Sequence, residues 1–281
     1  MEWKPPNKLK KAAQSVTRKF SDARAAARLF GGVLQKFDRG FDELALETGK
    51  SKFRLKMAYW TQTVPDLCRD AWGELISARV PAVQSQKTVI VFPGYMAKAT
   101  QMPKLLNALA ECGYEVRQVK GWLFFSTVRR ILAGGVTHIR QAKEKNQQIV
   151  LLGNSFGGAF AHQLGRKHDL PSISMSTPLD AKSGVFGVAV RLFGMKGFQD
   201  VEIPPKGISL VEQHSETIPF SKNDPPQIRR IEGVYSHLAI NNPKVVQTIV
   251  KATKSAFQIH YEMTPAVRPV GEPERKTETA A

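Results

Sequence analysis

The serine at position 155 stands in a sequence context that would suit a nucleophile. The apolar residues 149–152 lead directly into Gly153-Asn154-Ser155-Phe156-Gly157, and small residues follow. This order predicts a strand, a sharp turn with Ser155 at its tip, and a helix. Such a turn holds the serine at a strained positive φ, so that its hydroxyl projects clear of the backbone. Gly153 and Gly157 would keep side chains out of the close contact between strand and helix.

The elements that must position this turn alternate along the chain. Apolar runs predict strands at residues 88–92, 114–120, 149–152, 172–176, 208–212 and 227–234. Helical periodicity predicts helices at residues 102–112, 126–144, 156–167 and 243–257, with Gly113 ending the first of them. This alternation predicts an α/β fold in which a mostly parallel central sheet carries helices on both faces.

Three segments lie outside the alternation. Residues 1–86 form a basic, helical N-terminal extension: residues 9–30 are amphipathic, and residues 53–79 read as further helix, broken near Pro65. Residues 179–205 are apolar and glycine-rich, which fits either a lid over the site or a buried crossover helix. Residues 263–281 are rich in proline and charge and are expected to be a disordered tail.

Composition limits the partners of the chain. Its 281 residues include 41 Lys or Arg and 24 Asp or Glu, for a formal net charge of +17. Such a field attracts anions, including anionic membrane surfaces, which the basic helix at residues 9–30 could contact. The alternative, a helix that packs on its own domain and turns its basic face to solvent, is favoured over membrane contact. Nucleic acid is not expected as the main partner, because no nucleic-acid-binding motif accompanies the charge.

The sequence also indicates the compartment and the absence of certain cofactors. No apolar run approaches the length of a membrane span, and the charged N-terminus does not resemble a secretory signal. The two cysteines, Cys68 and Cys112, form no disulfide framework. We therefore expect a cytoplasmic protein, which could also bind at the periphery of the membrane. Metal-ligand spacing and phosphate- or dinucleotide-binding loops are missing from the sequence, and we expect neither metal nor cofactor.

The glycine-bracketed serine matches the nucleophile elbow, G-x-S-x-G, of one family. Together with Phe92-Pro93-Gly94-Tyr95 and the helix end at Gly113, it resembles bacterial α/β-hydrolases of the lipase/esterase kind over about residues 87–260. The resemblance implies that Ser155 is the nucleophile. It implies further that His237, directly after the last predicted strand, is the general base.

The resemblance leaves the acid of the triad open. Glu216 is the only carboxylate between His214 and Pro219, where the family places its acid. The usual Asp position aligns equally well with Ser215, and Asp224 is the alternative acid. Of the six histidines, only His237 has the order and setting of the base; His214, in the acid loop, is expected to be structural. The remaining four are expected to lie at the surface or in packing: His138, His162, His168 and His260.

The same resemblance implies an oxyanion hole and an activity. The backbone N–H groups of Tyr95, or alternatively Met96, and of Phe156 would stabilise the developing alkoxide. The expected activity is that of a serine hydrolase that cleaves a carboxylic ester, of a small molecule or a lipid, through an acyl-enzyme. An acyltransferase would use the same residues, and a non-catalytic binding or membrane-associating module of the same fold is the alternative from another class.

Overall fold

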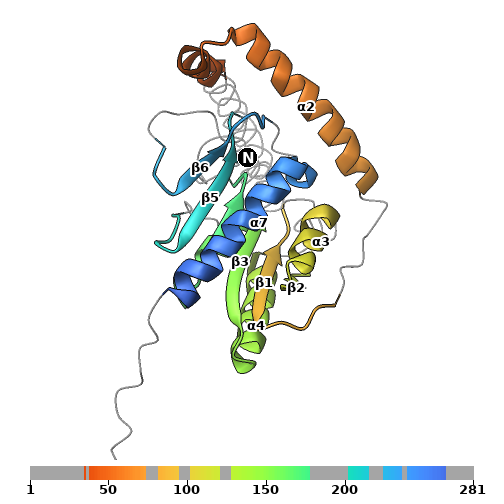
Figure 1. Ribbon diagram of the computed structural model, residues 1–281, viewed down its shortest axis with the longest axis vertical. Helices are drawn as coiled ribbons and strands as arrows, with labels where there is room; N and C mark the ends of the chain where they lie inside the picture. The colour runs from red at the N-terminus through yellow and green to blue at the C-terminus, as the bar shows by residue number, and fades with distance from the viewer. Residues whose placement is uncertain are drawn as a thin grey trace, which may run out of the picture.

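A sheet of six parallel strands forms the centre of the molecule (Figure 1). The computed structural model describes residues 35, 38–73, 82–94, 102–120, 128–177, 202–214, 224–235 and 239–263. The strands are β1 (Lys87–Phe92), β2 (Glu115–Gln118), β3 (Gln148–Asn154), β4 (Ser172–Met175), β5 (Gly207–Glu212) and β6 (Ile228–Ile231). Their order in space is β2-β1-β3-β4-β5-β6. The chain therefore reverses its direction of travel across the sheet between β1 and β3, which is where ligands bind in open parallel sheets.

Helices cover both faces of this sheet, as the sequence predicts. The helices α3 (Pro103–Glu111) and α7 (Pro243–Phe257) pack on one face, and α4 (Val128–Glu144) and α5 (Phe156–His168) pack on the other (Figure 1). Side chains alternate between the two faces along each strand. In β1, Val89 and Val91 join the core under α3 and α7, while Ile90 and Phe92 join the core under α4 and α5. Two buried faces explain why the strands read as continuous apolar runs.

The helical residues before the sheet pack against the segments that follow β5 and β6. Residues 38–48 are helical, and α2 (Lys52–Gly73) follows them at the end of the sheet where β5 and β6 end (Figure 1). They share a small core with Tyr235, which follows β6; its other members are Phe41, Leu44, Leu55 and Tyr59. The predicted break near Pro65 is wrong, because α2 continues past this residue to Gly73. Proline lacks a backbone N–H, so the helix loses one hydrogen bond at Pro65. The other hydrogen bonds of this 22-residue helix keep it continuous.

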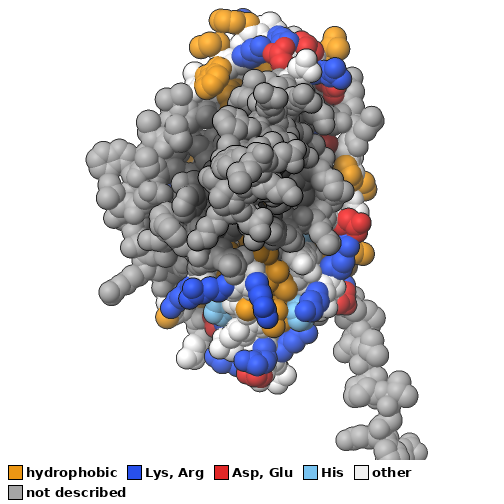
Figure 2. All heavy atoms as spheres, turned by 180° about the vertical axis from the view of Figure 1, so that it is seen from behind, with side chains coloured by type: hydrophobic (Ala, Val, Ile, Leu, Met, Phe, Trp, Pro, Cys, Tyr) orange, Lys and Arg blue, Asp and Glu red, His pale blue; other side chains and the backbone are white. Residues whose placement is uncertain are grey.

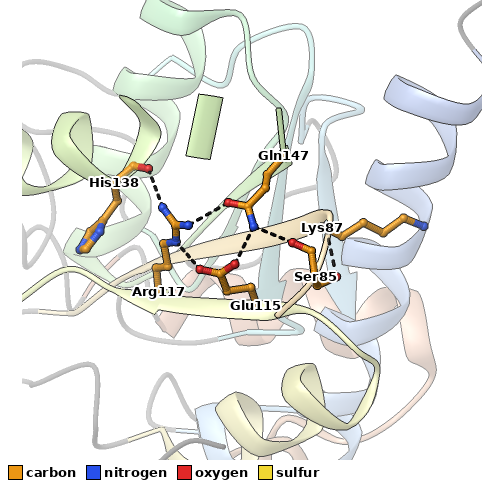
Figure 3. Close-up of polar contacts among 6 residues, drawn as sticks. All are labelled: Ser85, Lys87, Glu115, Arg117, His138 and Gln147. Atoms are coloured by element: carbon orange, nitrogen blue, oxygen red, sulfur yellow. Dashed lines mark hydrogen bonds and ion pairs between the residues drawn. The ribbon is translucent and has the colours of Figure 1, made fainter. Parts of the chain in front are cut away.

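A polar network ties the edge strand β2 to its neighbours at the amino ends of the strands (Figure 3). Arg117 donates from Nε to Glu115 Oε1 over 2.7 Å and from Nη2 to Gln147 Oε1 over 2.8 Å. Gln147 Nε2 in turn donates to the Ser85 carbonyl over 2.6 Å. Burial raises the pKa of Glu115, but the hydrogen bonds from Arg117 and Gln147 outweigh it and leave that pKa lowered. The network fixes β2 to the segments that lead into β1 and β3.

A second polar group lies fully buried between α5 and the sheet. His162 contacts the hydroxyls of Ser172, at Nδ1, and Ser174, at Nε2, each over 2.9 Å. Ser174 Oγ also forms a hydrogen bond with Ser209 Oγ over 3.0 Å. These contacts satisfy a neutral imidazole at both nitrogens. Burial lowers the pKa of His162 from 6.5 to about 4.

The free energy of unfolding should therefore fall as the pH is lowered from 6.5 to about 4. In this window the unfolded chain binds a proton at His162 that the folded chain does not, so acid favours unfolding. The loss attributable to His162 is about 3 kcal/mol. Urea unfolding of the native chain and of His162→Gln at about pH 7 and about pH 4.5 measures it. Equal losses in the two proteins would contradict the assignment.

Candidate functional site

Ser155 lies at the tip of the turn that joins β3 to α5. Its backbone angles are φ 50° and ψ −124°, a strained conformation for a residue other than glycine. The end of β4 holds this residue on both sides. The Ser155 N–H donates to the Met175 carbonyl over 2.7 Å, and Thr177 Oγ1 donates to the Ser155 carbonyl over 2.7 Å. The strain, of order 1–3 kcal/mol, is thus offset by hydrogen bonds that fix the position of the serine.

The glycines around Ser155 are required by the closeness of the backbones. A Cβ on Gly153 would lie 2.2 Å from the carbonyl carbon of Gly157. A Cβ on Gly157 would lie 2.4 Å from the Phe92 carbonyl oxygen, at the end of β1. Gly158 meets the same limit, since its Cβ would lie 1.9 Å from Thr177 Oγ1. These contacts confirm the predicted strand, sharp turn and helix, with glycines where side chains would clash.

The turn lies at the point where the chain reverses between β1 and β3. Pro93 and Gly94, which follow β1, run beside it: a Cβ on Gly94 would lie 3.4 Å from Ser155 Cβ. Ser155 is half-buried, and within the described residues no hydrogen bond engages its hydroxyl. The hydroxyl therefore lies at the carboxyl ends of the strands, where open parallel sheets bind their ligands.

One of the predicted oxyanion donors lies in the described part of the chain. Phe156 is the first residue of α5 and is buried. The N–H groups of a helix's first turn have no acceptor within the helix, and the helix dipole favours negative charge at that end. Phe156 thus has the backbone setting that an oxyanion donor needs, and its role stays a prediction. Tyr95 and Met96 lie outside the described residues.

The predicted base and acid, His237 and Glu216, also lie outside the described residues. The segments that lead to them do not, and these run side by side. Glu212, which ends β5, pairs with Ile231, which ends β6. Beyond them the Gln213 N–H donates to the Val234 carbonyl over 2.7 Å. The chain therefore enters both loops at neighbouring points on the edge of the sheet that carries Ser155.

Two other residues considered for the site have partners of their own. Asp224 forms an ion pair with Arg230, with 2.6 Å between Oδ2 and Nε. Arg230 also donates to the carbonyls of Glu212 and Gln213, so Asp224 braces the end of β5 through this arginine. His214 is fully buried and stands edge-on to the Phe41 ring, with 4.2 Å between ring centroids. This packing agrees with the structural role predicted for His214.

A buried carboxylate at the end of β5 escaped the sequence analysis. Glu212 is the last residue of the strand, and its exposed fraction is 0%. Alternation places its side chain on the same face as Leu210, the face covered by α3 and α7. A carboxylate buried at this edge of the sheet, beside the segment that leads to the predicted base, is a functional candidate. The available signal was a charged residue closing an otherwise apolar and small-residue strand.

Positive charge gathers on the face of α4 and α5 (Figure 2). The exposed basic residues of these helices and their ends are Arg129, Arg130, Arg140, Lys143, Lys145, Arg166 and Lys167.

Among the residues that the structure describes, no group of His, Cys, Asp and Glu side chains could hold a metal ion. No helix in that part of the chain is both long enough and apolar enough to cross a membrane.

Comparisons with known proteins add structural neighbours only. The chain matches no family model and no curated protein. A structure from work on LipS and LipT, two metagenome-derived lipolytic enzymes, is 14% identical, with a TM-score of 0.47, and covers 64% of this chain and 96% of its own. Carboxyl esterase 2 of the fungus Tuber melanosporum is 13% identical, with a TM-score of 0.46, over 62% of this chain and 78% of its own. Est1E of Butyrivibrio proteoclasticus is 14% identical, with a TM-score of 0.43, over 62% and 87%.

The fold is established by the chain's own geometry: a parallel sheet of order β2-β1-β3-β4-β5-β6, helices on both faces and a strained serine after β3. This is the fold of the α/β-hydrolases.

Proposed function

We propose that the chain is a serine hydrolase that cleaves a carboxylic ester through an acyl-enzyme intermediate. The observation that carries this proposal is the turn at Ser155, where φ is 50° and three glycines are needed to admit it. A strained serine at the carboxyl edge of a parallel sheet has no evident structural use, whereas a nucleophile must project from the backbone. Ester cleavage is proposed because a serine, a base and an oxyanion hole suffice for it and because the sequence resembles lipases and esterases.

In the proposed mechanism Ser155 Oγ attacks the ester carbonyl while His237 accepts its proton. The N–H groups of Phe156 and Tyr95 stabilise the tetrahedral oxyanion, each by about 3 kcal/mol in the transition state. His237 then returns the proton to the leaving alcohol, and water repeats the sequence to release the acid. An alcohol in place of water would make the same site an acyltransferase.

The acid that orients His237 is proposed to be Glu216, with Glu212 as the alternative that the structure brings forward. Glu216 has the sequence position of the family's acid. Glu212 is buried at the end of β5, next to the segment that leads to Glu216 and opposite the strand that leads to His237. Burial strengthens the interaction of a carboxylate with an imidazolium. The ion pair of Asp224 with Arg230 argues against the third candidate.

A lipid ester at an anionic membrane surface is the substrate setting that the charge favours. The net charge of +17 supports such a surface, and residues 9–30 are proposed to contact it. Large apolar side chains on one face of α2 support the same setting: Phe53 is 73% exposed and Trp60 is 56% exposed. The proposed location is therefore the cytoplasm, at the periphery of the membrane.

The proposal predicts burst kinetics with activated esters. p-Nitrophenyl esters of increasing acyl length should release about one equivalent of nitrophenol rapidly, then more at the rate of deacylation.

Replacing the acid that orients His237 should lower kcat on the order of a thousandfold or more, because the imidazole loses the group that fixes its tautomer and acts as its counter-ion. Glu216→Gln and Glu212→Gln identify this acid.

Glu111→Gln, at the exposed end of α3, is the matched control for the loss of one carboxylate. It should leave kcat unchanged. Absence of nitrophenol release above the uncatalysed rate with every ester, with and without detergent, would contradict the hydrolase proposal and favour the non-catalytic binding module.

A further inference from the structure

The side chain of Gln62, on α2, forms hydrogen bonds with the backbone of the segment that follows β6. Gln62 Nε2 donates to the Gly233 carbonyl over 2.8 Å, and the Tyr235 N–H donates to Gln62 Oε1 over 2.9 Å. Both ends of one carboxamide are therefore used on one short segment, residues 233–235. The partners are separated by 171 and 173 residues in sequence, so the contact is tertiary and not part of a local turn.

The same segment is held from its other side by the residue after β5. The Gln213 N–H donates to the Val234 carbonyl over 2.7 Å, and Gln213 Oε1 accepts from the Gly233 N–H over 2.8 Å. Gly233 has φ 73°, which lets the chain turn away from β6 at this point. Two glutamines, one on α2 and one directly after β5, thus fix the path of three consecutive residues.

Apolar packing fastens α2 to this segment as well. Tyr235 is 4% exposed and belongs to the core formed with Phe41, Leu55 and Tyr59. Leu55, Tyr59 and Gln62 recur at helical spacing, so they lie on one side of α2 and meet the segment together. This packing holds the carboxamide in place and limits how far it can turn away.

We infer that Gln62 is a positioning residue for the hydrolase reaction, acting from outside the hydrolase core on the segment, residues 233–235, that leads to the base. This inference rests on the proposed function, in which His237, two residues after Tyr235, is the base. The imidazole must be placed against Ser155 to well within 1 Å, because a misplacement of about 1 Å can cost a factor of about 100 in rate. Gln62 fixes the last described residues before that loop.

The inference predicts a loss of kcat without a loss of fold. Gln62→Ala should lower kcat and the rate of fluorophosphonate labelling by about 10- to 100-fold, with KM changed less than about twofold. Hydrogen exchange at the Tyr235 amide should quicken in the same variant, since its acceptor is gone. Thr61→Ala is the matched control: Thr61 is exposed and bonds only to carbonyls of its own helix. It should behave as the native chain in every assay.

A conservative variant separates positioning from a merely structural role. Gln62→Glu keeps an acceptor for the Tyr235 N–H but loses the donor to the Gly233 carbonyl when ionised. Its kcat relative to the native chain should rise as the pH falls toward about 4.3, because a protonated carboxyl donates again. The free energy of unfolding, measured alongside, reports any loss of fold.

The outcomes are distinguishable. If the native chain is labelled and the Gln62→Ala variant is labelled at the same rate, the positioning role is overturned and the hydrolase proposal stands. A fall in kcat that only follows the unfolded fraction overturns it equally. A native chain that is neither labelled nor active overturns the proposed function and this inference together.

Discussion

Replacing Ser155 with alanine should abolish covalent labelling by a fluorophosphonate and lower kcat for ester hydrolysis by a factor on the order of 10⁵–10⁶. Alanine lacks the hydroxyl but keeps the Cβ, so it faces the same φ of 50° as serine. Both hydrogen bonds that hold the turn involve the backbone of residue 155 and survive the change. The free energy of unfolding should therefore stay close to that of the native chain.

Ser255→Ala, on α7, is the control for loss of a serine and should leave labelling complete. His237→Ala should also lose labelling, because the serine is then no longer activated. Persistent labelling of Ser155→Ala would place the reactive residue elsewhere and contradict the assignment. Labelling of the native chain only in detergent would instead indicate a site that opens at an interface.

Gly153→Ala should destabilise the whole fold by about 3 kcal/mol or more. Its Cβ would lie 2.2 Å from the Gly157 carbonyl carbon and 2.3 Å from the Gly158 nitrogen. These are backbone atoms, which cannot swing aside as a side chain can, so β3 and α5 must separate. Urea unfolding should show a lower midpoint, and labelling at Ser155 should be lost in the fraction that stays folded.

Gly113→Ala is the control for this prediction. Gly113 has φ 80° and would place its Cβ with nothing within 4 Å, so the change adds backbone strain without a clash. It should cost about 1 kcal/mol. Equal destabilisation by the two substitutions would show that the close passage at Gly153 is not what makes glycine necessary there.

The sequence predicted the centre of the fold well because local rules and global packing agree there. The strands are buried on both faces, which makes them apolar runs, and each glycine near Ser155 answers a contact made within a few residues or with β1. The helix end at Gly113 was predicted for the same reason, since φ 80° is a local requirement.

Prediction was poorer where distant residues decide the structure. The last strand was expected to reach residue 234 but ends at Ile231, because Gly233 turns the chain toward Gln62 and Gln213. Glu212 was passed over because a carboxylate at a strand end is common at surfaces, and only the surrounding elements bury it. The grip of Gln62 has no local signal at all, since its partners lie more than 170 residues away. Residues 179–205, expected to form either a lid or a crossover helix, lie almost entirely outside the described residues, as do residues 264–281 of the expected tail.

The contact between Gln62 and Tyr235 has a consequence for the order in which the chain folds. All of β1 to β6 lies between the two residues in sequence, so nearly the whole sheet must assemble before they meet. Contacts of such long separation bear the largest loop-closure entropy and form late. During synthesis α2 leaves the ribosome early, but the Gln62 carboxamide can form these hydrogen bonds only after residue 235 has been made. The carboxyl end of the sheet is therefore completed only after residue 235 has been made.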